Sequence, residues 1–141
     1  IAPAIFPDAD FDHEIMQEEI FGPLLPVIGY RDLAWAMGEI KAREKPLALY
    51  LFTQNKKTAR RILHSLSFGG GCVNDVVLHI TNHHLPFGGV GNSGMGAYHG
   101  KFGFETFSHQ KGIVKNTTLL DVPVRYAPFN EAKLKLLRKI L

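Results

Sequence analysis

Between residues 24 and 77 the chain alternates between apolar and amphipathic segments, and this alternation restricts the fold to few classes. Apolar stretches at residues 24–30, 47–53 and 72–77 predict three β-strands. Residues 32–44 and 55–66 have the helical spacing of apolar side chains. Strands and helices that alternate over short connections indicate a parallel sheet built from right-handed crossover units. We therefore expect the α/β class, with the first strand buried and the second covered on both faces.

The two helices have identifiable ends. Asp32 and Asn55 are expected to cap their N-termini, because a side-chain oxygen there accepts hydrogen bonds from unpaired backbone N–H groups. Gly69–Gly71 is expected to end the second helix. The apolar positions expected to face the core are Leu33, Ala36, Met37 and Ile40 in the first helix and Ala59, Ile62, Leu63 and Leu66 in the second.

Weaker patterns predict smaller elements outside this alternation. They are an edge strand at residues 1–6, a helical turn within 12–20, a short helix at 101–107, a strand at 112–115, an extended stretch at 122–128 and a basic amphipathic helix at 131–141. Leu134, Leu137 and Leu141 form the apolar side of the last helix. Such a helix can contact a membrane surface, but packing on the protein itself is its commoner role.

Residues 85–101, which we call the glycine loop, contain too many glycines for a helix or strand. Residues 89–94 read G-x-G-x-x-G, but Pro86 precedes them and a poor helix start follows, so the dinucleotide-binding reading of this motif is weak. In parallel sheets, ligands bind beyond the carboxyl ends of the strands. The loop before Leu24 and the glycine loop are expected to occupy that place.

Composition limits the classes of partner and compartment. The 141 residues are about one domain's length, and a net charge of +3 is too small to indicate nucleic-acid binding. The one cysteine, Cys72, excludes an internal disulfide and fits a reducing, cytoplasmic compartment. The apolar start at Ile1, without an initiator methionine or signal peptide, predicts a piece of a longer protein.

Candidate chemical groups do not form a complete catalytic set. Neighbouring His83 and His84 point opposite ways on a regular strand, so with His79 and His99 nearby we still expect no metal site. Cys72 lies in an apolar strand, where the role of a small hydrophobe is commoner than that of a nucleophile. No catalytic residue is therefore expected in this chain.

Several motifs together resemble the aldehyde dehydrogenase superfamily. They are Glu18–Pro23, Pro86–Gly89 and Ser93–Gly96, and the endings Tyr98–Lys101 and Glu105–His109 resemble its class 3 branch, which handles fatty and aromatic aldehydes. The resemblance runs over nearly the whole chain in the correct order. It implies the carboxyl-terminal part of such an enzyme, with the nucleophilic cysteine and general base upstream and the segment inactive alone.

The resemblance also implies roles for particular residues. In the family the cysteine attacks the aldehyde to give a thiohemiacetal, hydride passes to NAD or NADP, and water hydrolyses the thioester. By position, Glu19 would hold the nicotinamide-ribose hydroxyls and Phe21 would pack beside the nicotinamide. Phe87 would line the aldehyde tunnel, and His99 would reach it. These cofactor-binding and substrate-binding roles are expectations drawn from the family.

Structural and assembly roles follow from the same resemblance. Asn74, Gly88 and Gly89 would support the site, and the strand at Ile113–Val114 would join subunits of a homodimer. The implied domains are the carboxyl-terminal part of the catalytic domain (1–110), an oligomerisation strand (111–120) and a carboxyl-terminal extension with an amphipathic helix (121–141). The alternative is a truncated, non-catalytic subunit that pairs with a full-length relative.

Overall fold

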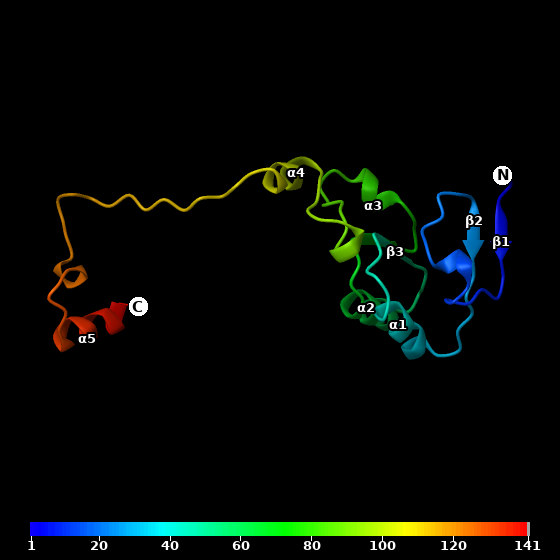
Figure 1. Cartoon of the computed structure of the whole chain (residues 1–141), viewed down its shortest axis with the longest axis horizontal. Coiled ribbons are helices and arrows are strands. Elements are labelled where there is room, and N and C mark those ends of the chain that lie inside the picture. Colours follow the sequence, from blue (N-terminus) through cyan, green and yellow to red (C-terminus); the bar gives the residue numbers. More distant parts are fainter. Residues whose placement is uncertain (141) are drawn as a thin grey trace. The chain divides into compact units, whose positions relative to one another are not determined.

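The computed structural model describes residues 1–140 and divides the chain into two units, Ile1–Ser108 and His109–Leu141 (Figure 1). The first unit contains β1 (Ala4–Phe6), η1 (Glu14–Met16), β2 (Leu24–Pro26), α1 (Leu33–Lys41), β3 (Ala48–Leu51), α2 (Lys56–Ser65), β4 (Gly70–Val73), α3 (Leu78–Thr81), η2 (Gly91–Ser93) and α4 (Gly100–Thr106). The second contains η3 (Pro123–Arg125) and α5 (Glu131–Ile140).

Helices and parallel strand pairs give the first unit the predicted α/β fold. β3 and β4 pair in parallel with α2 between them, which is the expected crossover unit. β1 pairs in parallel with β2, as the predicted edge strand. The prediction of one continuous sheet was wrong, because within the described residues β2 and β3 belong to separate two-stranded sheets. Sequence order shows that strands alternate with helices, but it does not show which strands pair.

Both predicted helix caps are confirmed. The carboxylate of Asp32 accepts hydrogen bonds from the backbone N–H groups of Ala34 and Trp35 at 3.0 and 3.2 Å. The side-chain oxygen of Asn55 likewise accepts from the second and third residues of α2. α1 ends at Lys41, short of the predicted Glu44. The caps therefore fix where each helix begins more firmly than the sequence fixes where it ends.

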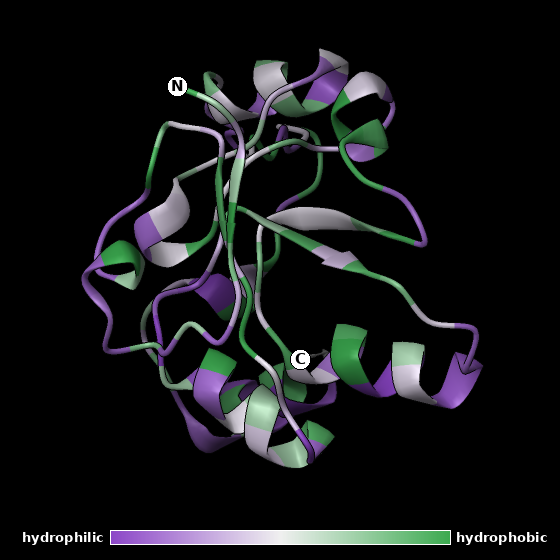
Figure 2. Cartoon of the chain, turned by 90° about the vertical axis from the view of Figure 1, so that its right-hand side faces the viewer, coloured by the Kyte–Doolittle hydropathy of each residue, from purple (hydrophilic) through white to green (hydrophobic). Residues whose placement is uncertain are grey.

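A small core lies where α1 and α2 meet the β3–β4 sheet. Met37, Ile62 and Leu66 are buried, and four partly buried side chains pack against them: Leu33, Leu49, Leu51 and Phe68. Along the helices the residue colours alternate between hydrophobic green and hydrophilic purple, as in amphipathic helices (Figure 2). Ile40 and Leu63, which were predicted to face the core, remain exposed. The core therefore uses only part of each apolar stripe, namely Leu33 and Met37 from the first and Ile62 and Leu66 from the second.

The predicted burial of the strands was wrong. Leu25 in β2 is exposed, and Leu47, Tyr50 and Phe52 in and beside β3 are exposed as well. Each strand has one neighbour within the described residues, so one edge of each strand stays uncovered.

β4 begins earlier than predicted. Gly70 and Gly71, expected in the helix-ending loop, are the first residues of the strand, which ends at Val73 rather than Val77. A Cβ atom on Gly71 would overlap the carbonyl oxygen of Leu49 on β3. Glycine is therefore required here for the close approach of two backbones, and not for a turn.

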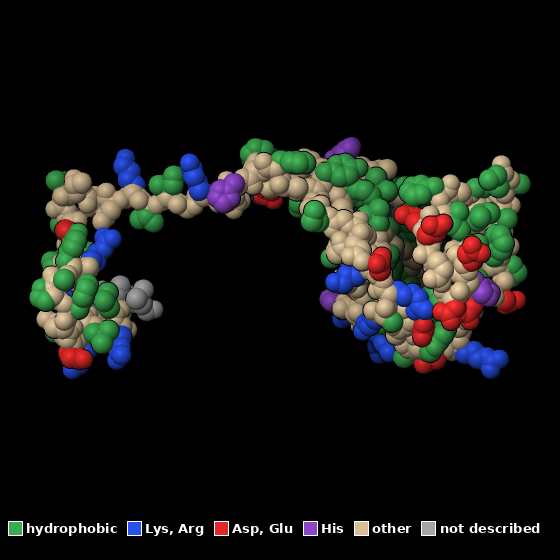
Figure 3. All heavy atoms as spheres, viewed as in Figure 1, with side chains coloured by type: hydrophobic (Ala, Val, Ile, Leu, Met, Phe, Trp, Pro, Cys, Tyr) green, Lys and Arg blue, Asp and Glu red, His purple; other side chains and the backbone are tan. Residues whose placement is uncertain are grey.

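The second unit differs from its prediction in two places. The strand expected at residues 112–115 is not formed, and residues 123–125 of the expected extended stretch form η3. A strand requires a hydrogen-bonded neighbour, and the described chain offers none to residues 112–115. Ile113 and Val114 are 76% and 95% exposed, among other hydrophobic side chains on the surface of this unit (Figure 3).

α5 confirms the predicted terminal helix up to Ile140, and the expectation for Leu141 lies outside the described residues. Lys133 on this helix donates a hydrogen bond to the carbonyl oxygen of Tyr126 at 2.6 Å. Across residues 1–140, no helix combines the length and the apolar character needed to cross a membrane.

Candidate functional site

An open cavity of about 590 Å³ lies between three loops of the first unit. Glu19 lines it from the segment before β2, Lys45 from the loop after α1, and Asn92 and Ser93 from the glycine loop. Its volume is within the usual range of about 300–1,000 Å³ for small-molecule sites. The cavity therefore brings one predicted cofactor residue to the glycine loop.

The position of this cavity corrects an expectation. The sequence predicted both loops beyond the carboxyl ends of the strands, but the cavity includes residues 45–48, at the start of β3. Gly69, just before β4, explains the difference, because its missing side chain admits the backbone of Gly88 and Gly89. After β4 the chain therefore turns back, and the glycine loop lies at the amino-terminal ends of β3 and β4.

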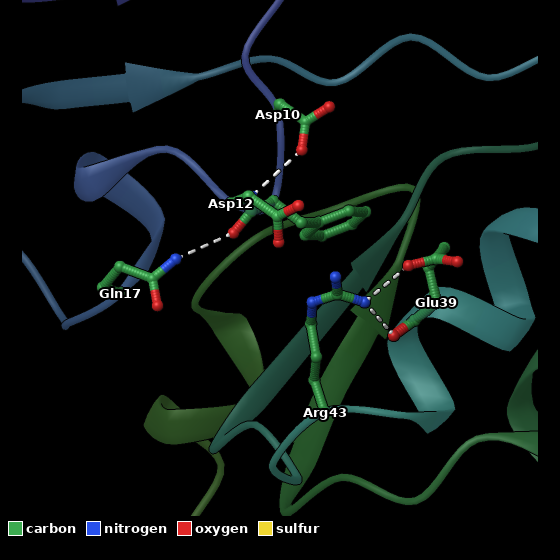
Figure 4. A network of polar contacts seen from close by, with 6 residues as sticks. Asp10, Asp12, Gln17, Glu39 and Arg43 are labelled. Atoms are coloured by element: carbon green, nitrogen blue, oxygen red, sulfur yellow. Dashed lines mark hydrogen bonds and ion pairs between the residues drawn. The ribbon is translucent and has the colours of Figure 1, made fainter.

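The segment that carries Glu19 is anchored to α1 by polar and aromatic contacts (Figure 4). Gln17 donates a hydrogen bond to the carbonyl oxygen of Phe11 at 3.1 Å. The guanidinium carbon of Arg43 lies 3.7 Å from the centre of the Phe11 ring, and Arg43 also forms a 2.8 Å ion pair with Glu39. An arginine over an aromatic face is attracted to it electrostatically. These contacts hold the segment beside the cavity.

The other wall of the cavity is held by a contact that bridges 48 residues of sequence. The side-chain amide of Asn92 donates a hydrogen bond to the carboxylate of Glu44 at 2.6 Å. Both residues line the cavity beside Glu19. Neither Glu44 nor Asn92 was predicted, because a contact between distant loops leaves no local pattern in a sequence.

Gly88 and Gly89 are sterically required in the glycine loop. A Cβ on Gly88 would overlap the carbonyl oxygen of Gly96, and one on Gly89 would overlap the backbone of Ser93. The hydroxyl of Ser93 bonds back to Val90, accepting from its N–H at 2.9 Å and donating to its carbonyl at 3.1 Å. Backbone atoms of the loop therefore occupy the space that side chains at Gly88 and Gly89 would need, which makes the loop a compact turn.

Phe87 lines a second, smaller cavity of about 290 Å³. This cavity also includes Gly88, Gly89, Tyr98 and further residues of the glycine loop, and it shares Leu47 and Ser93 with the Glu19 cavity. The backbones of Phe87 and Tyr98 exchange two hydrogen bonds, at 3.1 and 2.9 Å. The two cavities are thus neighbours with a common wall.

His99 is buried, at 8% exposure, but is not among the residues that line either cavity. Its Nδ1 lies 3.1 Å from the carbonyl oxygen of Leu85, and its ring centre is 4.3 Å from that of Tyr98 and 6.2 Å from that of Phe87. In this structure His99 packs against Phe87 and Tyr98, which line the second cavity, but does not line that cavity itself.

Two further predicted residues lie away from these cavities. Phe21 is 96% exposed and lines neither cavity. Asn74 lies just after β4, where its side chain accepts from the N–H of Thr53 at 2.8 Å and donates to the carbonyl of Thr53 at 3.0 Å. It therefore joins the carboxyl ends of β3 and β4, whereas Glu19 lies near their amino ends.

Within residues 1–140, no group of three or more His, Cys, Asp or Glu side chains is placed to hold a metal ion. Three of the histidines that cluster in sequence pack against other rings instead. His79 is buried against β4, and the ring of His83 packs 5.1 Å from that of His99. The arrangement is therefore a polar and aromatic surface around two cavities.

Comparison with known proteins gives a consistent set of relatives. Residues 1–113 match the model of the "Aldehyde dehydrogenase family". The whole chain is 50% identical to "Aldehyde dehydrogenase family 3 member H1" of Arabidopsis thaliana and covers 29% of it. Over 91% of the chain, identity is 51% to the rat "Aldehyde dehydrogenase, dimeric NADP-preferring", again covering 29% of that relative.

Among solved structures, the substrate-bound state of Staphylococcus aureus AldH has a TM-score of 0.91 and 45% identity to this chain. The match covers 99% of this chain and 30% of that one. The chain thus spans less than a third of the length of the relatives that it matches.

Proposed function

Because the chain belongs to the aldehyde dehydrogenase family, and relatives about half identical to it are family 3 members, we propose that it forms part of an NAD(P)-dependent aldehyde dehydrogenase. This enzyme oxidises aldehydes to carboxylic acids through a cysteine thiohemiacetal and thioester. Our proposal assigns the nucleophile and the general base to a part of the protein outside these 141 residues. The segment supplies residues for the cofactor and for the aldehyde, and is inactive alone.

The observation that carries this proposal is the placement of Glu19 in an open cavity opposite the glycine loop. An ionised carboxylate accepts hydrogen bonds from two hydroxyl groups at once, which suits a ribose. From the glycine loop, Asn92 and Ser93 line the same cavity, which is open to solvent and has a volume of about 590 Å³. These residues fit the ribose end of NAD or NADP. When bound, this cofactor accepts the hydride from the substrate.

The aldehyde side of the proposal rests on the second cavity. Phe87, Tyr98 and Leu47 give it aromatic and aliphatic walls, as a fatty or aromatic aldehyde requires. His99 contacts Phe87 and Tyr98 and thereby orients this wall. The phenyl ring of Phe21 is nearly fully exposed. Its proposed packing beside the nicotinamide therefore requires the cofactor to lie on the solvent-exposed side of this phenyl ring.

Assembly and location belong to the same proposal. We propose a homodimer in which residues 112–115 pair as a strand with the other subunit, supported by the exposure of Ile113 and Val114 and by the word "dimeric" in the name of the rat relative. A cytoplasmic location is proposed from the single free cysteine.

The test is Glu19→Gln in the intact enzyme. The substitution keeps the shape but removes the charge, and hydrogen bonds to a charged group contribute roughly 1.5–3 kcal/mol. We expect cofactor binding about 10- to 100-fold weaker in titration calorimetry, with slower hydride transfer in single-turnover experiments. Glu14→Gln, on the exposed η1 turn outside both cavities, is the matched control and leaves both values unchanged. Unchanged kinetics in Glu19→Gln would remove Glu19 from the cofactor site.

The exposed Ile113–Val114 stretch also favours the second candidate, a non-catalytic subunit that pairs with a full-length relative. An immunoblot of the source cells against this segment separates the two. A band far larger than 15.7 kDa supports the enzyme, and a band at 15.7 kDa, together with co-purification of a full-length relative, supports the pairing subunit.

A further inference from the structure

The single cysteine of the chain faces a buried histidine. Cys72 lies on β4, half-buried, and its Sγ is 3.7 Å from the Nδ1 of His79 on α3. His79 is 7% exposed and packs with its ring centre 5.7 Å from those of Tyr50 and Phe87. Its position is therefore fixed by aromatic neighbours on two sides.

The second nitrogen of this ring has no partner. Nε2 of His79 is buried, and no hydrogen-bonding atom of the described residues reaches it. Leaving a buried polar group unpaired costs about 1–3 kcal/mol, and such groups are rare in folded proteins. The packing of His79 therefore leaves an uncompensated polar atom that a ligand could satisfy.

The contact with Cys72 determines which ring nitrogen of His79 accepts a hydrogen bond and which one donates. When the Cys72 thiol donates to Nδ1, the neutral ring of His79 carries its proton on Nε2. The thiol then has a base beside it, which is the arrangement that activates cysteine nucleophiles. The unpaired N–H at Nε2 is a donor for an acceptor oxygen. The pair thus offers a nucleophile on β4 and, on the ring of His79, a base and a donor, with Tyr50 and Phe87 holding that ring in place.

We propose that Cys72 and His79 form a modification site for α,β-unsaturated carbonyl compounds. In the reaction, Nδ1 of His79 takes the thiol proton while the sulfur bonds to the β-carbon of the electrophile. The electron pair of the carbon–carbon double bond moves onto the α-carbon and the carbonyl oxygen, and the proton then returns to the α-carbon. No oxidant or reductant is required, and the site is independent of the function proposed above.

The test measures adduct formation at Cys72 of the intact enzyme by peptide-mapping mass spectrometry with N-ethylmaleimide and with trans-2-hexenal. The segment contains no second cysteine, so Cys72→Ser measures any addition to its lysines or histidines. We expect one Cys72-dependent adduct in the wild type and a rate at least about tenfold lower in His79→Gln, since a positioned base typically contributes that much or more. His83→Gln is the matched control and reacts like the wild type, because its ring contacts His99 rather than Cys72.

A second variant separates the chemistry from folding. His79→Ala removes the base and opens a cavity, and added imidazole is expected to restore most of the lost rate. A misfolded variant would instead expose the thiol and raise the rate. Three results would each overturn the proposal. The first is a reaction in His79→Gln that is as fast as in the wild type or faster, and the second is failure of imidazole to restore the rate of His79→Ala. The third is labelling of Cys72 only after denaturation.

Discussion

The glycine loop and the apolar segment of residues 111–120 both lack long helices or strands, yet they are stabilised in opposite ways. In the glycine loop, Phe87 and Tyr98 pair through their backbones, and the hydroxyl of Ser93 bonds within its own turn. In the apolar segment, the recorded hydrogen bonds are two short-range ones made by Thr117 and Leu119. Residues of the glycine loop form hydrogen bonds with one another. The apolar segment instead exposes apolar side chains that another chain would bury.

The largest expected effect tests this requirement for a partner. Replacing both Ile113 and Val114 with Asp introduces two charges where the proposed dimer buries apolar surface. Burying such a side chain contributes about 1.5–3 kcal/mol, so we expect the dimer to weaken on the order of 100-fold or more. Sedimentation velocity over a concentration series measures the dissociation constant.

The matched control places the same two charges just beyond this stretch. Asn116→Asp with Thr117→Asp keeps Ile113 and Val114 and is expected to weaken the dimer much less. If both double variants dissociate equally, charge rather than lost apolar contact is responsible. If neither dissociates, residues 112–115 are not the dimer strand.

The next effect tests whether the glycine loop is held by its own backbone. In Gly89→Ala the new Cβ would overlap the backbone of Ser93, which can yield only by shifting the turn. Overpacking of this kind costs typically 1–3 kcal/mol, and we expect a loss of about 3 kcal/mol in the free energy of unfolding. Urea denaturation followed by circular dichroism measures it.

Gly38→Ala is the control for this substitution. Gly38 lies inside α1 with open space around its Cα, so the added methyl group meets nothing within 4 Å. Alanine is the better helix former, and we expect stabilisation by about 1 kcal/mol. A Gly89→Ala variant as stable as Gly38→Ala would show that the glycine loop is not tightly packed.

The local parts of this fold were predictable from sequence. Asp32 and Asn55 cap helices through contacts two and three residues away, so the sequence window that shows them contains the whole interaction. The β3–α2–β4 unit and the irregular course of the glycine loop follow from patterns of similar length.

The parts that depend on distant contacts were not predictable. In the sequence, Gly70 and Gly71 at the start of β4 are typical of a helix end. Their role in the strand follows only from the close approach of the Leu49 backbone to Gly71. The bond between Glu44 and Asn92 joins residues with no shared pattern. Residues 112–115 have strand composition, but a strand also requires a neighbour. The two loops that line the cavities were thus predictable, but the Glu44–Asn92 contact and the strand ends at which the cavities lie were not.

The smallest expected effect compares one type of residue in the two regions. Thr106 links α4 to the glycine loop, donating to the carbonyl of Ala97 at 2.8 Å and accepting from its N–H at 3.3 Å. Thr106→Val keeps the shape and removes these bonds, so we expect a loss of about 1 kcal/mol in urea denaturation. Thr117→Val removes one exposed, short-range bond in the apolar segment, and we expect a change within about 0.5 kcal/mol. Equal losses would mean that residues 111–120 are as firmly held by their own chain as the glycine loop is, and that they require no partner.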